Sequence, residues 1–514
     1  MSTSTVKSLP RILANQARFQ VRCLPSSRKT MAMMSPATKT RTEKREGDIS
    51  DAFASLEGGV EIPLEPRFAD LKKRLLAGRE DVIVASWNRL LEHLRDQVAT
   101  IQRHRSKLIP EISFSDVMKG KVGADFSAAY KKYGVCIIRG VVDEQTALEY
   151  KRSILEYVAK NPHTKAFPQH DPQVFELYWS EAQLRARSHP NVISAQCFLM
   201  SFWNASQRAE ISLRHPIAYA DRLRIRQPGD SSFALGPHMD GGSLERWEEG
   251  GYALAQTYDK IFEGKWEEYD PWNADKRVGA VIDLYGGVGN CSAFRTQQAW
   301  LSISNIKGGE GHLKVNPLHG FATAYILLRP FFESKRGAED VSEDQYLSPE
   351  NWRLELETSP KIQGASPGHG QSVHAKLHPH LQLQHTMVHV PAVAPGDYVA
   401  WHCDTIHAVD SVHNGSQDSS VLYIPACPLT ETNANYLLRQ RDCFLAGKPS
   451  PDFGGGEGES RHVDRPTVAQ LSEWGGEQGL QSMGLKKWNS QEQGLRDGEK
   501  TVMKIANSVL GFPA

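Results

Sequence analysis

Between residues 190 and 430 the sequence consists of short apolar runs separated by Gly, Pro and Asn, and this pattern most limits how the chain can fold. Many short strands with turn residues between them are typical of a sandwich or a barrel. A jelly roll, which is a double-stranded β-helix, fits the pattern best. The runs expected to form strands are RLRIRQP, AVIDLYG, AWLSISN, HLKVNP, TAYILL, MVHVPAV, DYVAWHC and SVLYIPA.

Helical segments flank this region, so the expected fold class is mainly β with flanking helices (α+β) around a double-stranded β-helix core. Residues 68–105 carry apolar residues at helical spacing, with Gly78 as the break between two helices, and we expect them to pack outside the core. Residues 133–161 predict a buried strand, a turn and a helix capped by Asp143. Two further helices are expected near the end of the chain, at 466–474 and 496–509.

Changes in composition indicate the domain organisation. Basic residues but no acidic ones precede Glu43, amid Ser, Thr and Ala, which is the composition of a mitochondrial-type transit peptide or of a disordered basic tail. The glycine-rich stretch FGGGEGES at 453–460 lacks the strand and the Lys-Ser/Thr of a phosphate-binding loop, so it is interpreted as a linker. The expected parts are a disordered basic leader at 1–60, a helical extension at 66–112, a double-stranded β-helix domain at 113–445 with an insertion at 333–380, and a linker with C-terminal helices at 446–514.

The overall composition excludes several classes of protein. The chain has 60 basic and 60 acidic residues, so its net charge gives no reason to expect a nucleic-acid partner. Its 7 cysteines are scattered singly, which argues against a disulfide framework and indicates a reducing compartment. No apolar run approaches the roughly 18 residues of a membrane-spanning helix. We therefore expect an intracellular protein, cytoplasmic or mitochondrial, with no membrane partner.

One short motif suggests a metal site. In GPHMDGG, His238 and Asp240 stand two positions apart, between an expected strand and a glycine pair. The pair alone is weak evidence, because His-x-Asp recurs at 402–404. Two imidazoles and one carboxylate on one face leave three adjacent positions open on Fe(II), so a further histidine on a late strand would complete a site. His402 and His407 are both candidates, and side-chain alternation does not choose between them at a strand end.

The order of three motifs carries a family resemblance. GPHMDGG, QQAWLSISNIKGGEGHLKVNP and PGDYVAWHCDTIHAVDSVHNGS together resemble the iron/2-oxoglutarate dioxygenase superfamily, with phytanoyl-coenzyme-A-hydroxylase-like members closest. More narrowly, the chain is similar to a microbial family of uncharacterised proteins known only as a domain of unknown function. The resemblance covers about residues 110–445. It implies that His407 is the distal ligand beside His238 and Asp240, and that the cofactors are Fe(II) and 2-oxoglutarate as cosubstrate.

The sequence departs from the superfamily pattern at one point. Related dioxygenases carry an arginine on the last core strand, which holds the distal carboxylate of 2-oxoglutarate, but this chain reads NGSQDSSVLYIPA there. Arg295 is the first substitute, because an unpaired cation in an apolar strand would be costly. Pairing of Arg295 with a neighbouring acid such as Asp283 is an equal alternative. Lys314, and Arg226 or Arg224, are the other candidates.

The sequence thus predicts an Fe(II)/2-oxoglutarate-dependent oxygenase that hydroxylates a small-molecule substrate, with His238, Asp240 and His407 as its catalytic metal ligands. Two alternatives remain: a cupin-like metal enzyme that does not use 2-oxoglutarate, and a non-catalytic jelly-roll binding protein. The histidine-rich run HAKLHPHLQLQH at 374–385 is expected to be a solvent-facing loop. The sequence specifies neither the substrate nor the oligomeric state.

Overall fold

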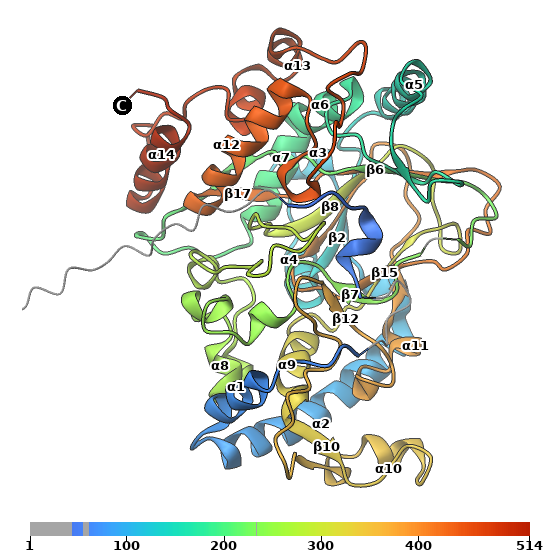
Figure 1. The fold of residues 1–514 in the computed structure, drawn as a ribbon, viewed down its shortest axis with the longest axis vertical. Helices are drawn as coiled ribbons and strands as arrows, with labels where there is room; N and C mark the ends of the chain where they lie inside the picture. Colours follow the sequence, from blue (N-terminus) through green and yellow to red (C-terminus); the bar gives the residue numbers. More distant parts are fainter. Residues whose placement is uncertain (1–43, 55–60, 233, 514) are drawn as a thin grey trace, which may run out of the picture. The chain divides into compact units, whose positions relative to one another are not determined.

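The computed structural model describes residues 44–54, 61–232 and 234–513. Contacts divide the chain into two units, Met1–Thr42 and Glu43–Ala514. The first unit, and with it most of the expected basic leader, lies outside the described residues. Within the described part of the second unit the chain is α+β, with two large sheets and helices packed around them (Figure 1).

The larger sheet has eight strands, all paired antiparallel except β1 and β2, which are parallel. Its middle strands are almost entirely buried, because the sheet is covered on both faces. In spatial order the strands are β1 (Glu111–Ser113), β2 (Val135–Arg139), β14 (Tyr398–His402), β8 (Gln297–Ser302), β16 (Ser419–Tyr423), β6 (Leu223–Arg226), β4 (Val174–Phe175) and β3 (Ala166–Phe167).

The smaller sheet has five short antiparallel strands. Strands of the two sheets alternate along much of the chain: β6, β8, β14 and β16 belong to the larger sheet, and β7, β9, β13 and β15 to the smaller one. Side chains from both sheets line one cavity. In spatial order the strands of the smaller sheet are β12 (Gln371–Ser372), β7 (His238–Met239), β15 (His407–Val409), β9 (Leu313–Val315) and β13 (Val388–His389).

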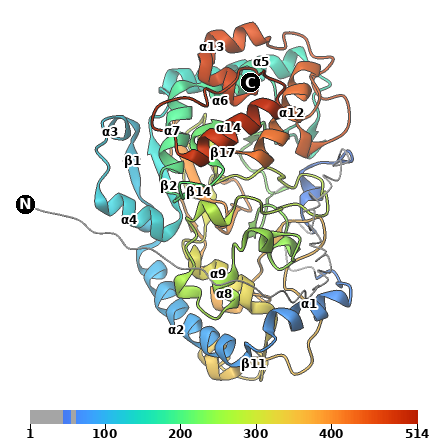
Figure 2. The ribbon, with the colours of Figure 1, turned by 90° about the vertical axis from the view of Figure 1, so that its left-hand side faces the viewer.

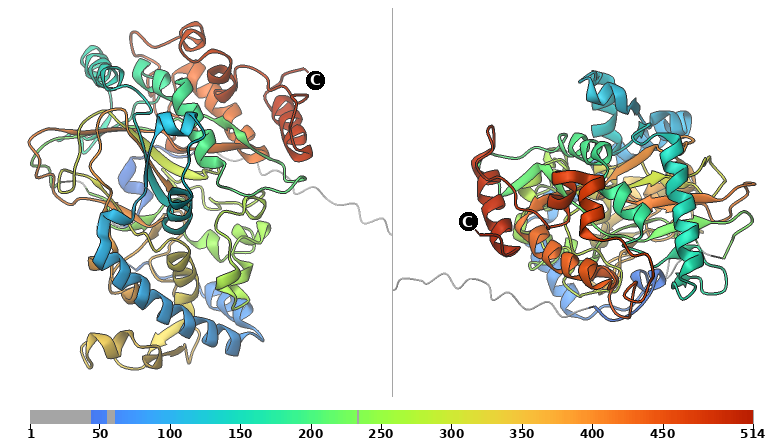
Figure 3. Two further views of the ribbon diagram at one scale, coloured as in Figure 1. Left: turned by 180° about the vertical axis from the view of Figure 1, so that it is seen from behind. Right: turned by 90° about the horizontal axis from the view of Figure 1, so that it is seen from above.

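Helices cover the face of the larger sheet that points away from this cavity (Figure 3). Alternate residues of β2, β8, β14 and β16, such as Ile138 and Leu301, pack in one cluster with the apolar face of α5 (Glu144–Lys160). The expected cap of α5 is present, since the Asp143 side chain accepts a hydrogen bond from the amide of Thr146. Two more helices join this layer, α6 (Glu181–Ser188) and α7 (Pro190–Met200).

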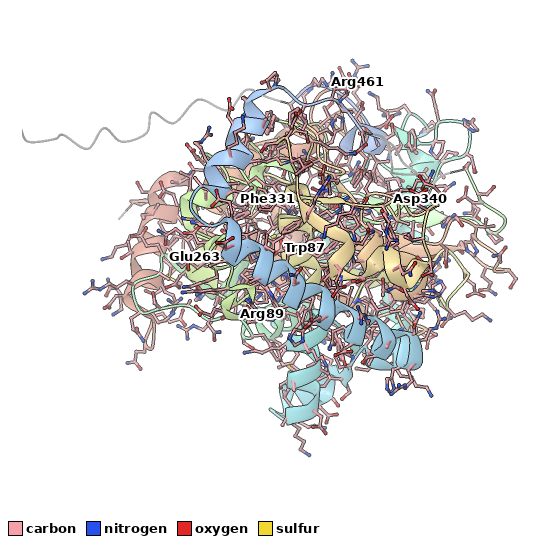
Figure 4. All side chains as sticks on the ribbon, turned by 90° about the horizontal axis from the view of Figure 1, so that it is seen from below. Trp87, Arg89, Glu263, Phe331, Asp340 and Arg461 are labelled. Carbon is pink, nitrogen blue, oxygen red and sulfur yellow. The ribbon has the colours of Figure 1, made fainter. Side chains whose placement is uncertain are left out.

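The two expected N-terminal helices form on either side of Gly78, which has a positive φ of 71°. They are α1 (Arg67–Leu76) and α2 (Glu80–His104). Contrary to expectation, α2 contributes to the main core rather than packing outside it. The Trp87 side chain is fully buried and stacks on Phe332, with ring centroids 4.4 Å apart, while Arg89 faces outward (Figure 4).

Two of the runs expected to be strands are not strands. TAYILL belongs to helix α9 (Gly320–Leu328), and the residues of AVIDLYG, 280–286, form no strand. A short apolar run has the same appearance in a fully buried helix and in a buried strand, and α9 is buried on nearly every side. In the second run, Asp283 and Gly286 belong to a loop, where Asp283 forms an ion pair with Lys44.

The expected insertion at 333–380 is partly integrated into the fold. It carries α10 (Glu343–Leu347) and a hairpin of β10 (Phe332–Ser334) with β11 (Trp352–Leu354). Its last part supplies β12, which pairs with β7 in the smaller sheet. The insertion therefore reaches the strand that carries His238.

The C-terminal region packs against the body instead of following a free linker (Figure 2). Its helices are α12 (Glu431–Ala446), α13 (Val468–Ser482) and α14 (Asp497–Val509), and they share a core cluster with the two-stranded sheet of β17 (Cys427–Thr430) and β5 (Ile211–Ile217). In the glycine-rich stretch, the buried Glu459 carboxylate accepts hydrogen bonds from the amides of Tyr178 and Trp179, both at 2.9 Å. Buried hydrogen bonds of this kind fix the stretch in place.

The remaining α-helices are α3 (Phe114–Met118), α4 (Ala124–Tyr133), α8 (Asp259–Phe262) and α11 (Leu383–Thr386). Among the described residues, no helix has the length and apolar character needed to cross a lipid bilayer.

Candidate metal centre

Two neighbouring strands of the smaller sheet bring three potential metal ligands together. His238 on β7 and His407 on β15 are direct partners in the antiparallel register, and Asp240 follows β7. The Asp240 Oδ1 atom lies 3.3 Å from His238 Nε2 and 3.9 Å from His407 Nε2. The ligand atoms of all three side chains lie within 4.8 Å of one another. The structure thus places the three residues side by side, although more than 160 positions separate His407 from the early pair.

Backbone carbonyls fix the orientation of both imidazoles. His238 Nδ1 donates a hydrogen bond to the Gly236 carbonyl at 2.7 Å, and His407 Nδ1 donates to the Thr405 carbonyl at 3.1 Å. A neutral imidazole that donates through Nδ1 has its lone pair on Nε2, which is the form that binds a metal. Burial, together with the nearby His238, lowers the pKa of His407 to about 3, so this ring is neutral at physiological pH.

Asp240 is the anionic member of the group. Burial opposes its ionisation, but the contact with His238 and the positive charge of Arg295 outweigh this and hold the pKa of Asp240 well below its usual value. Arg295 Nη2 donates to Asp240 Oδ2 at 3.2 Å, on the oxygen other than the one that faces the imidazoles. Two imidazoles and one carboxylate form a donor set that suits Fe(II) and leaves coordination positions open.

A second group of potential metal donors, His402, Cys403 and Asp404, has its donor atoms occupied by the protein. His402 Nε2 donates to the Pro271 carbonyl at 3.0 Å, and its Nδ1 accepts from the Asp404 amide at 3.1 Å. His402 therefore has no ring nitrogen left for a metal. The Asp404 carboxylate accepts hydrogen bonds from three buried or half-buried donors, Arg277, Tyr258 and Tyr269.

The three clustered side chains face a cavity of about 140 Å³. Three arginines line it: Arg295, and Arg222 and Arg224 from the β6 side. Side chains alternate along a strand, so residues 222 and 224 lie on the same face. Their spacing could have predicted that both arginines face the cavity. The apolar lining residues include Trp300, Ile306, Leu313, Trp401, Val409 and Val421.

The other two expected cosubstrate cations do not line this cavity. Lys314 Nζ pairs with Asp410 Oδ1 at 3.0 Å. Arg226 lies on the same face of β6 as Arg224, but its side chain forms a buried ion pair with Asp230 at 2.5 Å. For Arg295 the expected alternative partner was Asp283, whereas the carboxylate that it contacts is that of Asp240.

The sequence-based reasoning missed one part of the cavity wall. Ile49, Ala52 and Phe53 line the cavity, although these residues were assigned to the disordered leader. The Phe53 ring meets the His238 ring edge-on, with centroids 4.6 Å apart. The composition could have separated these residues from the leader, because the basic stretch ends at Glu43 and apolar residues appear soon afterwards.

Comparisons with known proteins agree on one group of relatives. The sequence model of the family described as Gig2-like matches residues 62–485. The uncharacterized protein YbiU of Escherichia coli (strain K12) is 30% identical over 402 residues, which make up 75% of this chain and 89% of that protein.

Two solved structures are similar over most of their length. The crystal structure of the GlcNAc inducible gene 2 protein of Candida albicans has a TM-score of 0.77 and 31% identity, covering 88% of this chain and 96% of that one. A provisionally named oxidoreductase of Salmonella typhimurium LT2 has a TM-score of 0.69 and 29% identity, covering 83% of this chain and 99% of that one.

Proposed function

This chain belongs to the Gig2-like family, and from that premise and the geometry of its cavity we propose that it is an Fe(II)- and 2-oxoglutarate-dependent oxygenase acting on a small molecule. The observation that carries the proposal is the convergence of His238, Asp240 and His407 within 4.8 Å at the wall of a cavity. The name of the Salmonella relative is consistent with an oxidoreductase.

We propose further that the core is a double-stranded β-helix. The alternation of strands between two antiparallel sheets supports this, because a double-stranded β-helix is a ribbon of paired strands wound into two facing sheets. In such a core the ligands of β7 and β15 would face inward, toward the larger sheet. The lining of the cavity by Trp300 and Val421 from that sheet fits this arrangement.

Each residue of the centre has a distinct task in this proposal. His238 and His407 would hold the iron through Nε2, and Asp240 would supply the negative charge. The bound iron would supply the oxidising chemistry that couples decarboxylation of 2-oxoglutarate to hydroxylation of the substrate. Arg295 would keep the Asp240 carboxylate in one orientation through its bond to Oδ2.

The cosubstrate requires a cation for its distal carboxylate. Among the described residues, strand β16 contains no arginine, but Arg224 on the neighbouring β6 lines the cavity and lies opposite Val421 of β16 in the register. Arg295 is already bonded to Asp240. We assign the distal carboxylate to Arg224 because of this position beside β16, where Tyr423 also lies in the cavity wall. A guanidinium can grip a carboxylate with two parallel hydrogen bonds.

The metal assignment is tested by iron content. Protein purified without oxygen is analysed for iron, as are the variants His238→Ala, Asp240→Ala and His407→Ala. We expect the wild type and the matched control His369→Ala, at a histidine that lies outside the cavity lining, to bind iron, and the three ligand variants to lose it. Unchanged iron content in both histidine variants would overturn the assignment.

The cosubstrate assignment needs a separate experiment. Calorimetric titration of 2-oxoglutarate into Mn(II)-loaded protein should show binding that Arg224→Met weakens by roughly 30-fold, because a charged hydrogen bond is lost. Lys314→Met, outside the cavity lining, is the control and should leave the affinity unchanged. Absence of binding to the wild type would instead favour a cupin-like metal enzyme, for which the lack of an arginine on β16 already speaks.

A further inference from the structure

The described N-terminal segment, residues 44–54, runs beside the smaller sheet and forms part of the wall of the metal cavity (Figure 1, blue). We call this segment the strap. Three of its residues, Ile49, Ala52 and Phe53, line the cavity. Phe53 is the one that touches a proposed ligand, because its ring packs edge-on against His238.

A buried ion-pair network holds the first residue of the strap. The Lys44 side chain is only 3% exposed, and its ammonium lies 3.1 Å from Asp283 Oδ2 and 3.3 Å from Asp452 Oδ1. It also donates a hydrogen bond to the Asn290 carbonyl. Removing one partner from such a buried group leaves an uncompensated charge and is strongly unfavourable. Lys44 therefore ties the strap to two loops of the body.

The far end of the strap fits closely against glycines. The Gly370 amide donates to the Ala52 carbonyl at 2.9 Å, just before β12 begins. A Cβ at Gly370 would lie 2.8 Å from the Phe53 ring, and one at Gly289 would lie 3.2 Å from Ala52 Cβ. Any side chain at Gly370 would therefore displace Phe53 from its place beside His238.

We propose that Phe53 is a specificity-determining residue, which limits the size of the molecule that fits beside the metal. The strap is fixed at Lys44 and at Ala52, so the Phe53 ring occupies space next to His238 that a larger ligand would need. The substrate class is then a small molecule, since the cosubstrate would occupy part of the same cavity. The claim that Phe53 limits the size of a molecule bound at the metal rests on the proposed function. The claim that Phe53 forms part of the cavity wall does not.

The size limit is measured with two chelators on the Co(II)-loaded full chain. Acetohydroxamate and benzohydroxamate carry the same metal-binding group but differ in bulk. We expect the wild type to prefer acetohydroxamate, and Phe53→Ala to reduce this preference by about tenfold or more. The matched control Phe126→Ala, on α4 and outside the cavity lining, should keep the wild-type preference. An unchanged preference in Phe53→Ala would overturn the proposal.

A second measurement tests the wall without any metal. Cys291 also lines the cavity and is 3% exposed, whereas Cys136 lies fully buried in β2. Alkylation by iodoacetamide, followed by peptide mass spectrometry, should be about tenfold faster at Cys291 in metal-free Phe53→Ala than in the wild type, with Cys136 unchanged. An unchanged alkylation rate at Cys291 would contradict the claim that Phe53 closes the cavity. An equal rise at both cysteines would also contradict it, because it would indicate global opening.

The two measurements separate the proposals. If the wild type fails to bind Co(II) through His238, the proposed oxygenase function fails, and the Cys291 rates still decide whether Phe53 closes the cavity. If Co(II) binds but neither readout changes in Phe53→Ala, the specificity role alone is lost.

Discussion

Buried arginines support the loops that carry the proposed ligands. Arg246 Nη2 donates to the backbone carbonyl of Asp240 at 3.2 Å. Arg277 pairs with Asp404, three residues before His407, and these two side chains are only 3% and 1% exposed. Burial opposes the ionisation of Asp404, but the positive charge of Arg277 outweighs it and holds the pKa of Asp404 well below its usual value. The pair is therefore ionised throughout the neutral range. The loop leading to His407 is thereby fixed.

Replacing Arg277 by Gln should destabilise the protein strongly, because Asp404 would remain as a buried charge without its partner. We expect the free energy of unfolding to fall by roughly 3–5 kcal/mol. Arg89→Gln, which breaks an exposed ion pair with Glu267, should cost at most about 1 kcal/mol. Urea unfolding followed by circular dichroism measures both. Equal small losses would contradict this account of the Arg277 pair.

Arg295 gives a second prediction, on metal affinity. Arg295→Met removes the donor to Asp240 Oδ2 and should weaken Co(II) binding by about 10–100-fold, as is usual when a hydrogen-bond partner of a metal ligand is lost. Titration of the visible Co(II) spectrum measures the affinity. Lys314→Met is the control, and a similar loss in both variants would show that the Asp240 contact is unimportant.

Among the secondary-structure elements, α2 shows best how a charged helix joins the core. Trp87 packs between Phe332 and Tyr325, with ring centroids at 4.4 and 5.4 Å, while the opposite face of the helix carries exposed charges. Helical periodicity predicted the helix but could not tell what its apolar face would contact.

Trp87→Ala should therefore cost roughly 3–5 kcal/mol of unfolding free energy, the range for large-to-small changes in a core. Val82→Ala on the same helix is the comparison, because Val82 is 50% exposed and should change stability little. Thermal and urea unfolding measure both variants. A small effect of Trp87→Ala would mean that α2 packs only loosely on the body.

Sequence patterns predicted elements well where the period was clear. The expected strands that precede His238 and His407, β6 and β14, form, as do the helices around Gly78 and after Asp143, whereas the short strands β7 and β15 that carry the two histidines were not expected. The patterns failed for α9, since a run that is apolar on all sides has no period to read. They also could not tell which cation faces the cavity. Arg224 and Arg226 occupy the same face of β6, and only the position of Asp230 separates them.

At the scale of the whole molecule, burial extends to groups that a sequence suggests are exposed. The histidine-rich run at 374–385 was expected to face solvent, yet His378 and His380 are buried at 1% and 4% exposure. Burial, with Arg329 nearby, lowers the pKa of each to about 3. Both rings are therefore neutral in the folded protein at any ordinary pH.

This burial predicts sensitivity to acid. Unfolded histidine titrates near pH 6.5. Below that pH these histidines bind protons in the unfolded chain but not in the folded chain. The free energy of unfolding therefore falls as the pH drops. Between pH 7 and pH 5 each of these histidines should remove on the order of 2 kcal/mol. His380→Gln should lessen the pH dependence by about that amount in urea unfolding at both pH values, and His104→Gln, at an exposed histidine, is the matched control. Parallel pH profiles for wild type and His380→Gln would refute this.

The register of β7 and β15 also bears on how such a chain can diverge. His238 and His407 are partners at a single register position of a sheet in which side chains alternate between faces. One residue gained or lost between the preceding turn and His407 would rotate the imidazole to the opposite face. Length variation among descendants of this chain should therefore be confined to segments such as 335–351, outside the paired strands.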